Sequence, residues 1–244
     1  MSFHHTMLVH STIKIDNHKP LVDRITKHLK FLRGVFRGNR QTRRERRVAF
    51  QEFHDYYIEN YLNPMTRRWN QKDAKGNTTE PPSWEAVVEK MKDILIKKPP
   101  EVLNVSSDEN VGADLDYHLY PEGRNVIAVG GMRLSRGLTL EGLTVSYFLR
   151  QAKEMKYDTV MQQGRWFGYR PGYDDLVRVF TTETLYEKLQ QIGKVETDLR
   201  DAVETYEKRG LSPLDFGVRV LVVLDMLPTA QRKMPDVTRT KATI

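Results

Sequence analysis

The chain has 244 residues, of which 39% are hydrophobic and 29% are charged, a balance typical of one large or two small soluble globular domains. It contains no cysteine, which excludes a disulfide framework and a thiolate zinc site. The formal net charge of +7 favours an acidic partner, most commonly nucleic acid for a basic domain. No apolar run is long enough to span a membrane, and the N-terminus lacks the order of a secretory signal. We therefore expect a cytoplasmic chain with no membrane partner.

Apolar patterns alternate between strands and helices, which predicts an α/β fold with a mostly parallel sheet flanked by helices. The predicted strands are His5–His10, Val102–Ser106, Asn125–Val129, Leu143–Phe148 and Leu176–Phe180. The predicted helices are Lys19–Leu32, Arg40–Leu62, Ser83–Lys98, Tyr157–Trp166 and Thr184–Lys208. Residues 72–82 and 108–123 are polar, so we expect loops there.

One stretch of the chain concentrates arginine at regular spacing. Steps of three and four residues would put five arginines on one face of a helix. They are Arg33, Arg37, Arg40, Arg44 and Arg47. Such a face attracts the phosphates of DNA, but a solvated helix surface has the same pattern, and both interpretations stay open.

A glycine-containing block follows the strand predicted at Asn125–Val129. It begins with Gly130 and Gly131 and continues to Arg136 and Gly137. Glycine permits a sharp turn and lets backbone N–H groups approach a phosphate. The block resembles motif V of superfamily-two helicases, which implies that the three glycines shape a nucleotide-binding turn and that Arg136 lies between nucleotide and nucleic acid. Taken alone, a strand followed by Gly-Gly is more often an ordinary turn.

A second block, Gln162-Gln163-Gly164-Arg165-Trp166-Phe167-Gly168-Tyr169-Arg170, lies on and just after a predicted helix. It resembles motif VI of the same helicases, which supplies an arginine finger to the γ-phosphate of ATP. The resemblance makes Arg165 the first candidate and Arg170 the second, with Gln162 orienting the nucleotide or a water. The five-residue separation departs from the commonest spacing of three. The aromatic side chains between the arginines could stack on bases or pack against the sheet.

The two blocks together are similar to the Z-one domain of bacterial and phage proteins labelled putative endonucleases, most specifically from about Asn125 to Gly217. This resemblance implies a module beside a superfamily-two helicase core, in defence against or processing of foreign DNA. It also implies a RecA-like lobe with a helical insertion. Residues 1–39 would start the lobe, 40–100 would form the basic insertion, 101–217 the core, and 218–244 a C-terminal extension.

The sequence lacks the phosphate loop Gly-x-x-x-x-Gly-Lys-Ser/Thr and the acidic motif that would hold Mg²⁺. ATP and Mg²⁺ are therefore expected only with a first RecA-like lobe that carries this loop, in a longer protein or on another chain. The leading hypothesis is the C-terminal lobe of a superfamily-two helicase or ATPase that acts on DNA and is inactive alone.

Two other functions remain open. The chain could be a DNA-binding or assembly module without chemistry, or a metal-dependent endonuclease. The acid-x-lysine tripeptides that a nuclease would use, Asp73-Ala74-Lys75 and Glu154-Met155-Lys156, are frequent by chance in so charged a chain. The histidines show no metal-ligand spacing, so we predict no metal site.

Overall fold

The computed structural model describes residues 4–11, 17–38, 43–63, 81–105, 115–131, 134, 139–149, 155–156, 160–162, 173, 176–211 and 226–227. The chain divides into two compact units. One unit contains Met1–Tyr147 and Tyr169–Val179, and the other contains Phe148–Gly168 and Phe180–Ile244.

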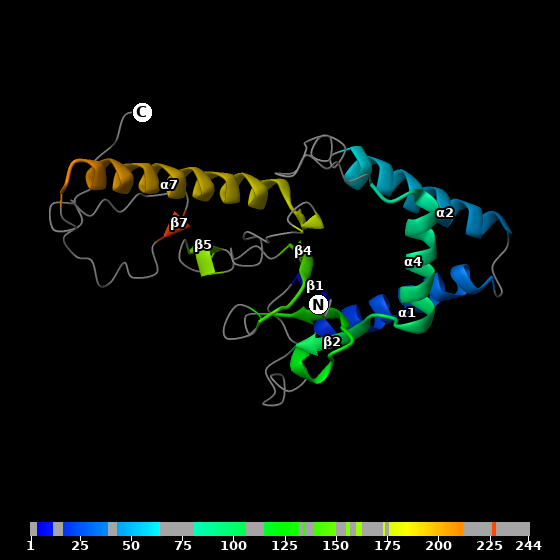
Figure 1. The fold of residues 1–244 in the computed structure, drawn as a ribbon. Coiled ribbons are helices and arrows are strands. Elements are labelled where there is room, and N and C mark those ends of the chain that lie inside the picture. Colours follow the sequence, from blue (N-terminus) through cyan, green and yellow to red (C-terminus); the bar gives the residue numbers. More distant parts are fainter. Residues whose placement is uncertain are drawn as a thin grey trace. The chain divides into compact units, whose positions relative to one another are not determined.

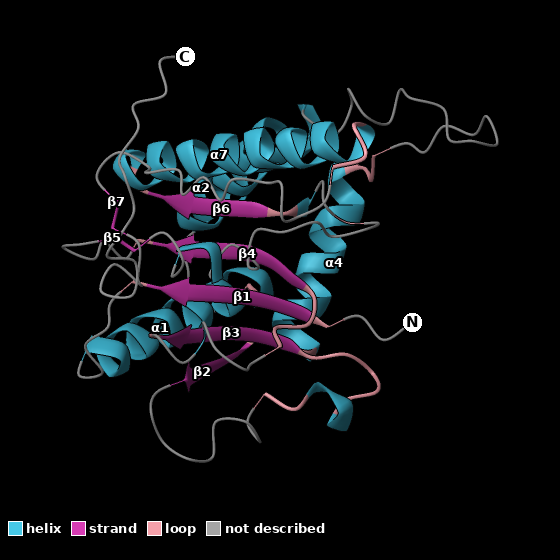
Figure 2. Cartoon of the chain, turned by 90° about the vertical axis from the view of Figure 1, so that its left-hand side faces the viewer, coloured by secondary structure: helices cyan, strands magenta, loops and turns pink. Residues whose placement is uncertain are grey.

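A five-stranded sheet with the order β2-β3-β1-β4-β6 is the main architectural element. Its strands are β1 (His5–His10), β2 (Glu101–Val105), β3 (Asn125–Gly130), β4 (Leu143–Phe148) and β6 (Arg178–Thr181). β3 pairs in parallel with both β1 and β2, and Figure 2 shows the arrows of β1, β4 and β6 pointing the same way. The predicted α/β fold with a mostly parallel sheet is therefore confirmed.

Burial along the strands follows their position in the sheet. Leu8 and Val9 of β1 and Ala128 and Val129 of β3 are buried, as expected for central strands that are covered on both faces. The edge strands β2 and β6 are more exposed. The apolar runs that predicted β1 and β3 from the sequence are thus explained by their central position.

Three helices share a core in the first unit (Figure 1). They are α1 (His18–Arg37), α2 (Arg43–Tyr57) and α4 (Trp84–Lys97), and a π-helical turn, η2 (Ile58–Leu62), follows α2. Val35, Phe36, Ala49 and Leu95 form the centre of this core. Because α1 also contacts β2 and β3, it joins the helical layer to the sheet.

The helix boundaries differ from the predicted ones in one respect that matters for function. α1 continues to Arg37 rather than ending at Leu32, and it stops at Gly38, which has the left-handed φ of 76° common at helix ends. The start of α4 agrees with the sequence, since the Ser83 hydroxyl accepts a hydrogen bond from the Ala86 N–H at 3.3 Å.

A buried polar network fixes the amino end of β1. The Thr6 hydroxyl donates to the carbonyl oxygen of Glu141 at 2.6 Å and lies 2.8 Å from the Tyr117 hydroxyl, which can donate to it. The Thr6 N–H donates to the Gly142 carbonyl at 3.0 Å. Because its polar groups are paired, this network can be buried at little cost.

The second unit contains the long helix α7 (Glu183–Lys208) and a parallel pair of two-residue strands, β5 (Met155–Lys156) and β7 (Met226–Leu227). Thr182 caps α7 by accepting a hydrogen bond from the Leu185 N–H. Buried Leu185 and Ile192 lie seven residues apart, which is two helical turns, and so they share a face. The sequence predicted α7 but not the β5–β7 pair.

Gly142→Ala should lower the free energy of unfolding by at least about 2 kcal/mol, because the left-handed region penalises alanine and the site is crowded. Gly142 has a φ of 62°, and a Cβ there would lie 1.7 Å from the His4 carbonyl oxygen. Denaturant unfolding monitored by circular dichroism measures the change.

The same substitution in α7 is the matched control. A Cβ on Gly193 would meet no neighbouring atom within 4 Å, and Gly193→Ala should stabilise the helix by roughly 0.5–1 kcal/mol. Equal stability of the two variants would contradict the crowding at Gly142.

Candidate functional site

The carboxyl ends of β1 and β3 form the strongest candidate site in the described part of the chain. The parallel register pairs Val9 with Val129, so His10 and Gly130 end their strands at the same edge. The chain leaves β1 toward β2 and leaves β3 in the opposite direction, toward β4. Because the connections leave this neighbouring pair of strands in opposite directions, the two strand ends form a topological switch point. Open α/β sheets bind ligands at such points.

This carboxyl-edge site, defined by His10, Gly130 and Gly131, includes two of the glycines predicted from the sequence. A Cβ on Gly130 would lie 2.6 Å from the Val105 carbonyl oxygen of β2 and 2.8 Å from Cδ1 of Leu134. Gly131 is also buried, and its carbonyl oxygen accepts a hydrogen bond from the Leu134 N–H at 3.2 Å. Glycine at position 130 is thus required by close packing.

Two buried histidines beside the strand ends were missed by the sequence analysis. His10 is the last residue of β1 and is 0% exposed, and His18, the first residue of α1, is 2% exposed. The signal available was their position, since one ends a predicted strand and the other precedes a predicted helix. Within the described residues, no three His, Asp or Glu side chains lie close enough together to hold a metal ion.

The remaining predicted nucleotide contacts are only partly described. Arg136, Gly137, Arg165 and Arg170 lie outside the described residues. Gln162 is exposed and belongs to a helical segment of the second unit whose described residues are 160–162. These residues stay predictions from the sequence.

The prediction of five arginines on one helix face is wrong. Arg33 and Arg37 belong to α1, whereas Arg44 and Arg47 belong to α2, and Arg40 lies outside the described residues. The physical reason is Gly38, whose left-handed conformation ends α1 and breaks the helical spacing.

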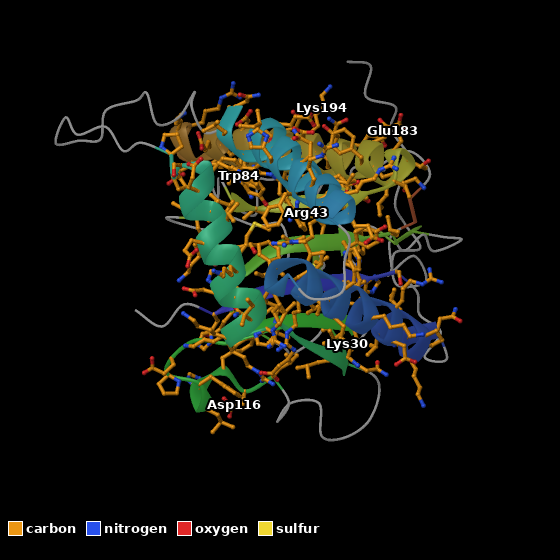
Figure 3. All side chains as sticks on the ribbon, turned by 90° about the vertical axis from the view of Figure 1, so that its right-hand side faces the viewer. Lys30, Arg43, Trp84, Asp116, Glu183 and Lys194 are labelled. Atoms are coloured by element: carbon orange, nitrogen blue, oxygen red, sulfur yellow. The ribbon has the colours of Figure 1, made fainter. Side chains whose placement is uncertain are left out.

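The end of α1 and the start of α2 nevertheless contact each other through an arginine. The Arg46 guanidinium packs over Gly38, since a Cβ there would lie 3.3 Å from Arg46 Nη1. This contact joins the start of α2 to the end of α1. The arginines that flank this contact in sequence are here called the basic corner, and they are Arg33, Arg37, Arg43, Arg44 and Arg47. Figure 3 labels Arg43 at the start of α2 and Lys30 on α1.

The electrostatics of the basic corner favour an anion. Arg43 and Arg44 begin α2, where the helix dipole already contributes positive partial charge, and Glu45 is the acidic residue of that turn. Arginines at a helix N-terminus are unfavourable for the isolated protein, and a bound phosphate would offset this repulsion. Arg37, Arg43, Arg44 and Arg47 are all exposed, so they are available to a partner.

Comparison with protein families gives a match to the Z1 domain over residues 1–225. The chain belongs to the Z1 domain family. The match covers both the sheet strands and the helical layer, and it therefore extends well upstream of Asn125, where the sequence resemblance becomes specific. Neither the curated proteins nor the solved structures gave a match to this chain.

Among the described residues of this Z1 domain, no helix combines the length and apolar character needed to cross a bilayer.

Gly130→Ala should destabilise the Z1 domain by about 2 kcal/mol, as expected for overpacking of a buried site. The loss should appear in thermal unfolding without any ligand, because the crowding involves Val105 and Leu134 of the protein itself. Adding Leu134→Ala should not restore stability, since the Val105 carbonyl remains 2.6 Å away. An unchanged melting temperature would mean that the protein accommodates the added Cβ and that packing does not require glycine at this position.

Proposed function

We propose that this Z1 domain is the second RecA-like lobe of a superfamily-two helicase or ATPase that acts on DNA. In this proposal ATP and Mg²⁺ bind only together with a first lobe that carries a phosphate loop. Arg165 and Arg170 are the candidate arginine fingers, Gln162 orients the nucleotide or a water, and Arg136 couples nucleotide to DNA. Gly130, Gly131 and Gly137 form the turn that approaches the nucleotide.

The observation that carries the proposal is the position of Gly130 and Gly131. They end a central parallel strand next to β1, at the topological switch point of the sheet. A motif V turn needs this location, because backbone N–H groups at a strand's carboxyl end can face a bound phosphate. Had the glycines followed an edge strand or an exposed loop, the resemblance would have lost its physical basis.

The basic corner supports the DNA-binding part of the proposal. Its exposed arginines contact phosphates well but form no arrangement for reading base edges. At the N-terminus of α2 the positive end of the helix dipole adds to the charge of the arginines, and both attract a polyanion. We therefore expect binding that depends on charge and tolerates any sequence.

The chain alone should show no steady-state ATP hydrolysis, because it lacks the groups that hold Mg²⁺ and the triphosphate. With a first lobe that carries a phosphate loop, hydrolysis should appear, and Arg165→Ala should slow it on the order of a thousandfold. A phosphate-release assay measures both rates. Arg170→Ala should have a comparable effect if the two arginines share the role.

Arg200→Ala provides the control for loss of a positive charge. Arg200 is an exposed arginine on α7, in the same unit as Arg165, and its removal should leave the rate unchanged. Wild-type rates for both Arg165→Ala and Arg170→Ala would remove the second block from the mechanism.

Charge reversal at Arg37, Arg44 and Arg47 should weaken DNA binding and flatten the dependence of log affinity on log salt. Each lost phosphate contact should reduce the magnitude of this slope by roughly 0.9 for duplex DNA, because fewer counterions are released. Fluorescence anisotropy over a series of salt concentrations measures affinity and slope together.

The matched control reverses Lys194, Arg200 and Arg209, three exposed cations of α7 and its C-terminal turn. It changes the net charge equally but leaves the basic corner intact. If both triple variants lose affinity to the same extent, binding reflects overall charge and the corner has no special role.

A further inference from the structure

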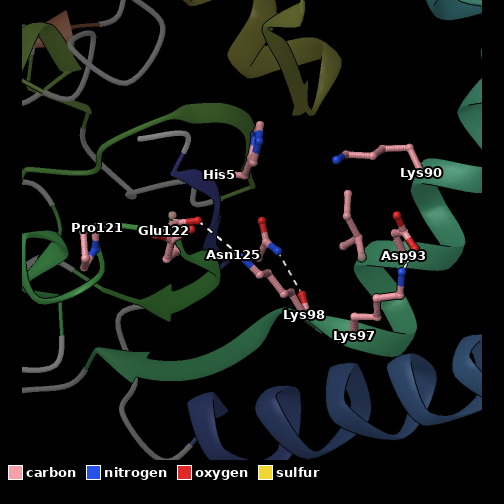
Figure 4. Close-up of a pocket in the computed structure, with 10 residues that line it drawn as sticks. His5, Lys90, Asp93, Lys97, Lys98, Pro121, Glu122 and Asn125 are labelled. Carbon is pink, nitrogen blue, oxygen red and sulfur yellow. Dashed lines mark hydrogen bonds and ion pairs between the residues drawn. The ribbon is translucent and has the colours of Figure 1, made fainter. Parts of the chain in front are cut away.

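A cavity of about 430 Å³ lies at the amino edge of the sheet, within the first unit. Its lining combines the first residues of two strands, His5 and Asn125, with the turn Pro121–Gly123 and one face of α4. The α4 residues are Lys90, Asp93, Ile94, Lys97 and Lys98, the last being its C-cap. Figure 4 draws the lining residues on α4, on the two strands and on the turn.

This amino-edge cavity is separate from the carboxyl-edge site. The six residues of β3 run from Asn125 in the cavity lining to Gly130 at the other end. At about 3.3 Å per residue the two ends are roughly 16 Å apart. A ligand in the cavity therefore does not contact Gly130, and the inference below does not depend on the proposed ATPase function.

Most charges of the cavity lining are already engaged. Lys97 pairs with Asp93 at 2.7 Å, and the Lys98 ammonium donates to the main-chain carbonyl of Glu122 at 3.4 Å. Asn125 donates its side-chain amide to the Lys98 carbonyl at 2.9 Å, which fixes the end of α4 against β3. These contacts hold the wall of the cavity in place without a ligand.

Lys90 is the exception. Its ammonium extends across the cavity toward His5 (Figure 4), and no hydrogen bond or ion pair engages it among the described residues. Burial lowers the pKa of His5, and the charges of Lys90 and His4 lower that pKa further. Three lysines against two carboxylates leave the lining with an excess of positive charge.

We propose that the amino-edge cavity binds a phosphate group between Lys90 and His5. A phosphate dianion would accept a hydrogen bond from the Lys90 ammonium and a second from a ring N–H of His5. The cavity volume falls within the range of small-molecule sites, so the phosphate can carry an organic group. Glu122 lies on the lining and limits affinity through repulsion.

The test titrates the purified full chain with inorganic phosphate at constant ionic strength while NMR follows the His5 ring, whose signal is assigned by its loss in His5→Gln. Phosphate should raise the pKa of His5, because the bound dianion stabilises the charged imidazolium. Sulfate, which does not itself titrate near neutral pH, should bind more tightly as the pH falls through the range of His5. No perturbation of His5 by either anion at tens of millimolar would overturn the proposal.

Three variants of exposed side chains test the charge assignment without disturbing the core. Lys90→Met should weaken phosphate binding by about tenfold, the loss of one charge-assisted hydrogen bond. Lys92→Met removes an exposed lysine from the same helix that does not line the cavity, and it should have little effect. Glu122→Gln should tighten binding roughly threefold by removing repulsion. Equal affinities of the Lys90 and Lys92 variants would refute the site.

Two arms of the experiment distinguish the source of the phosphate. One uses inorganic phosphate, and the other uses a short oligodeoxynucleotide with or without a 5′-phosphate. If the 5′-phosphorylated strand displaces inorganic phosphate from His5 and the dephosphorylated strand does not, the site recognises a strand end. If neither strand competes while inorganic phosphate still binds, the site is one for a small phosphate compound.

Discussion

The parallel pairing of β1 with β3 is the constraint on which the rest of the structure depends. The register from His5 opposite Asn125 to Val9 opposite Val129 fixes both edges of the sheet at once. At the carboxyl edge it brings Gly130 beside the end of β1, and at the amino edge it brings His5 and Asn125 into the lining of one cavity. A shift of one residue would turn every buried side chain of β1 to the other face of the sheet, so the apolar core enforces this register.

The amino edge is held more firmly than strand pairing alone would require. Arg124, which is buried, forms two hydrogen bonds with the Glu101 carboxylate, and its guanidinium lies 4.2 Å from the centre of the Tyr120 ring. Together with the Thr6 network, these contacts join β2, β3 and β1 at the same end. Removing one partner would leave a buried charge or hydroxyl unsatisfied, which costs more than the pair contributes. The amino-edge cavity is thus built on preorganised walls.

Several elements could be predicted from the sequence because their signals are local. The strands β1, β3 and β4 and the helix α7 were predicted from the spacing of their apolar residues, and β1 and β4 have the predicted bounds. The end of α1 was placed too early because the prediction followed the apolar period only as far as Leu32, whereas packing of Val35 and Phe36 against α2 and α4 continues the helix to Gly38. The β5–β7 pair joins residues about seventy positions apart in two-residue strands, for which no local pattern exists.

The candidate sites also differ in whether a local sequence pattern reveals them. Gly130 and Gly131 could be found because a strand followed by two glycines is a readable pattern. The amino-edge cavity could not, since His5, Lys90 and Asn125 are remote in sequence and meet only through the sheet register and the packing of α4. The arginine spacing gave a wrong prediction of one continuous helix face, because the regular spacing continues across the end of α1 at Gly38.

The length of α1 separates the two proposed binding events. It has 20 residues, so at 1.5 Å per residue it spans about 30 Å. It begins after β1, on the side of the carboxyl-edge site, and it ends at Gly38 in the basic corner. A nucleotide bound at Gly130 and a DNA phosphate bound at Arg37 therefore cannot touch each other. If the two ligands influence one another through this unit, α1 offers a direct route, because it contacts β2 and β3 as well as α2 and α4. A rigid helix with contacts to both layers can transmit a displacement, whereas direct electrostatic repulsion between the two anions over about 30 Å is screened at physiological salt.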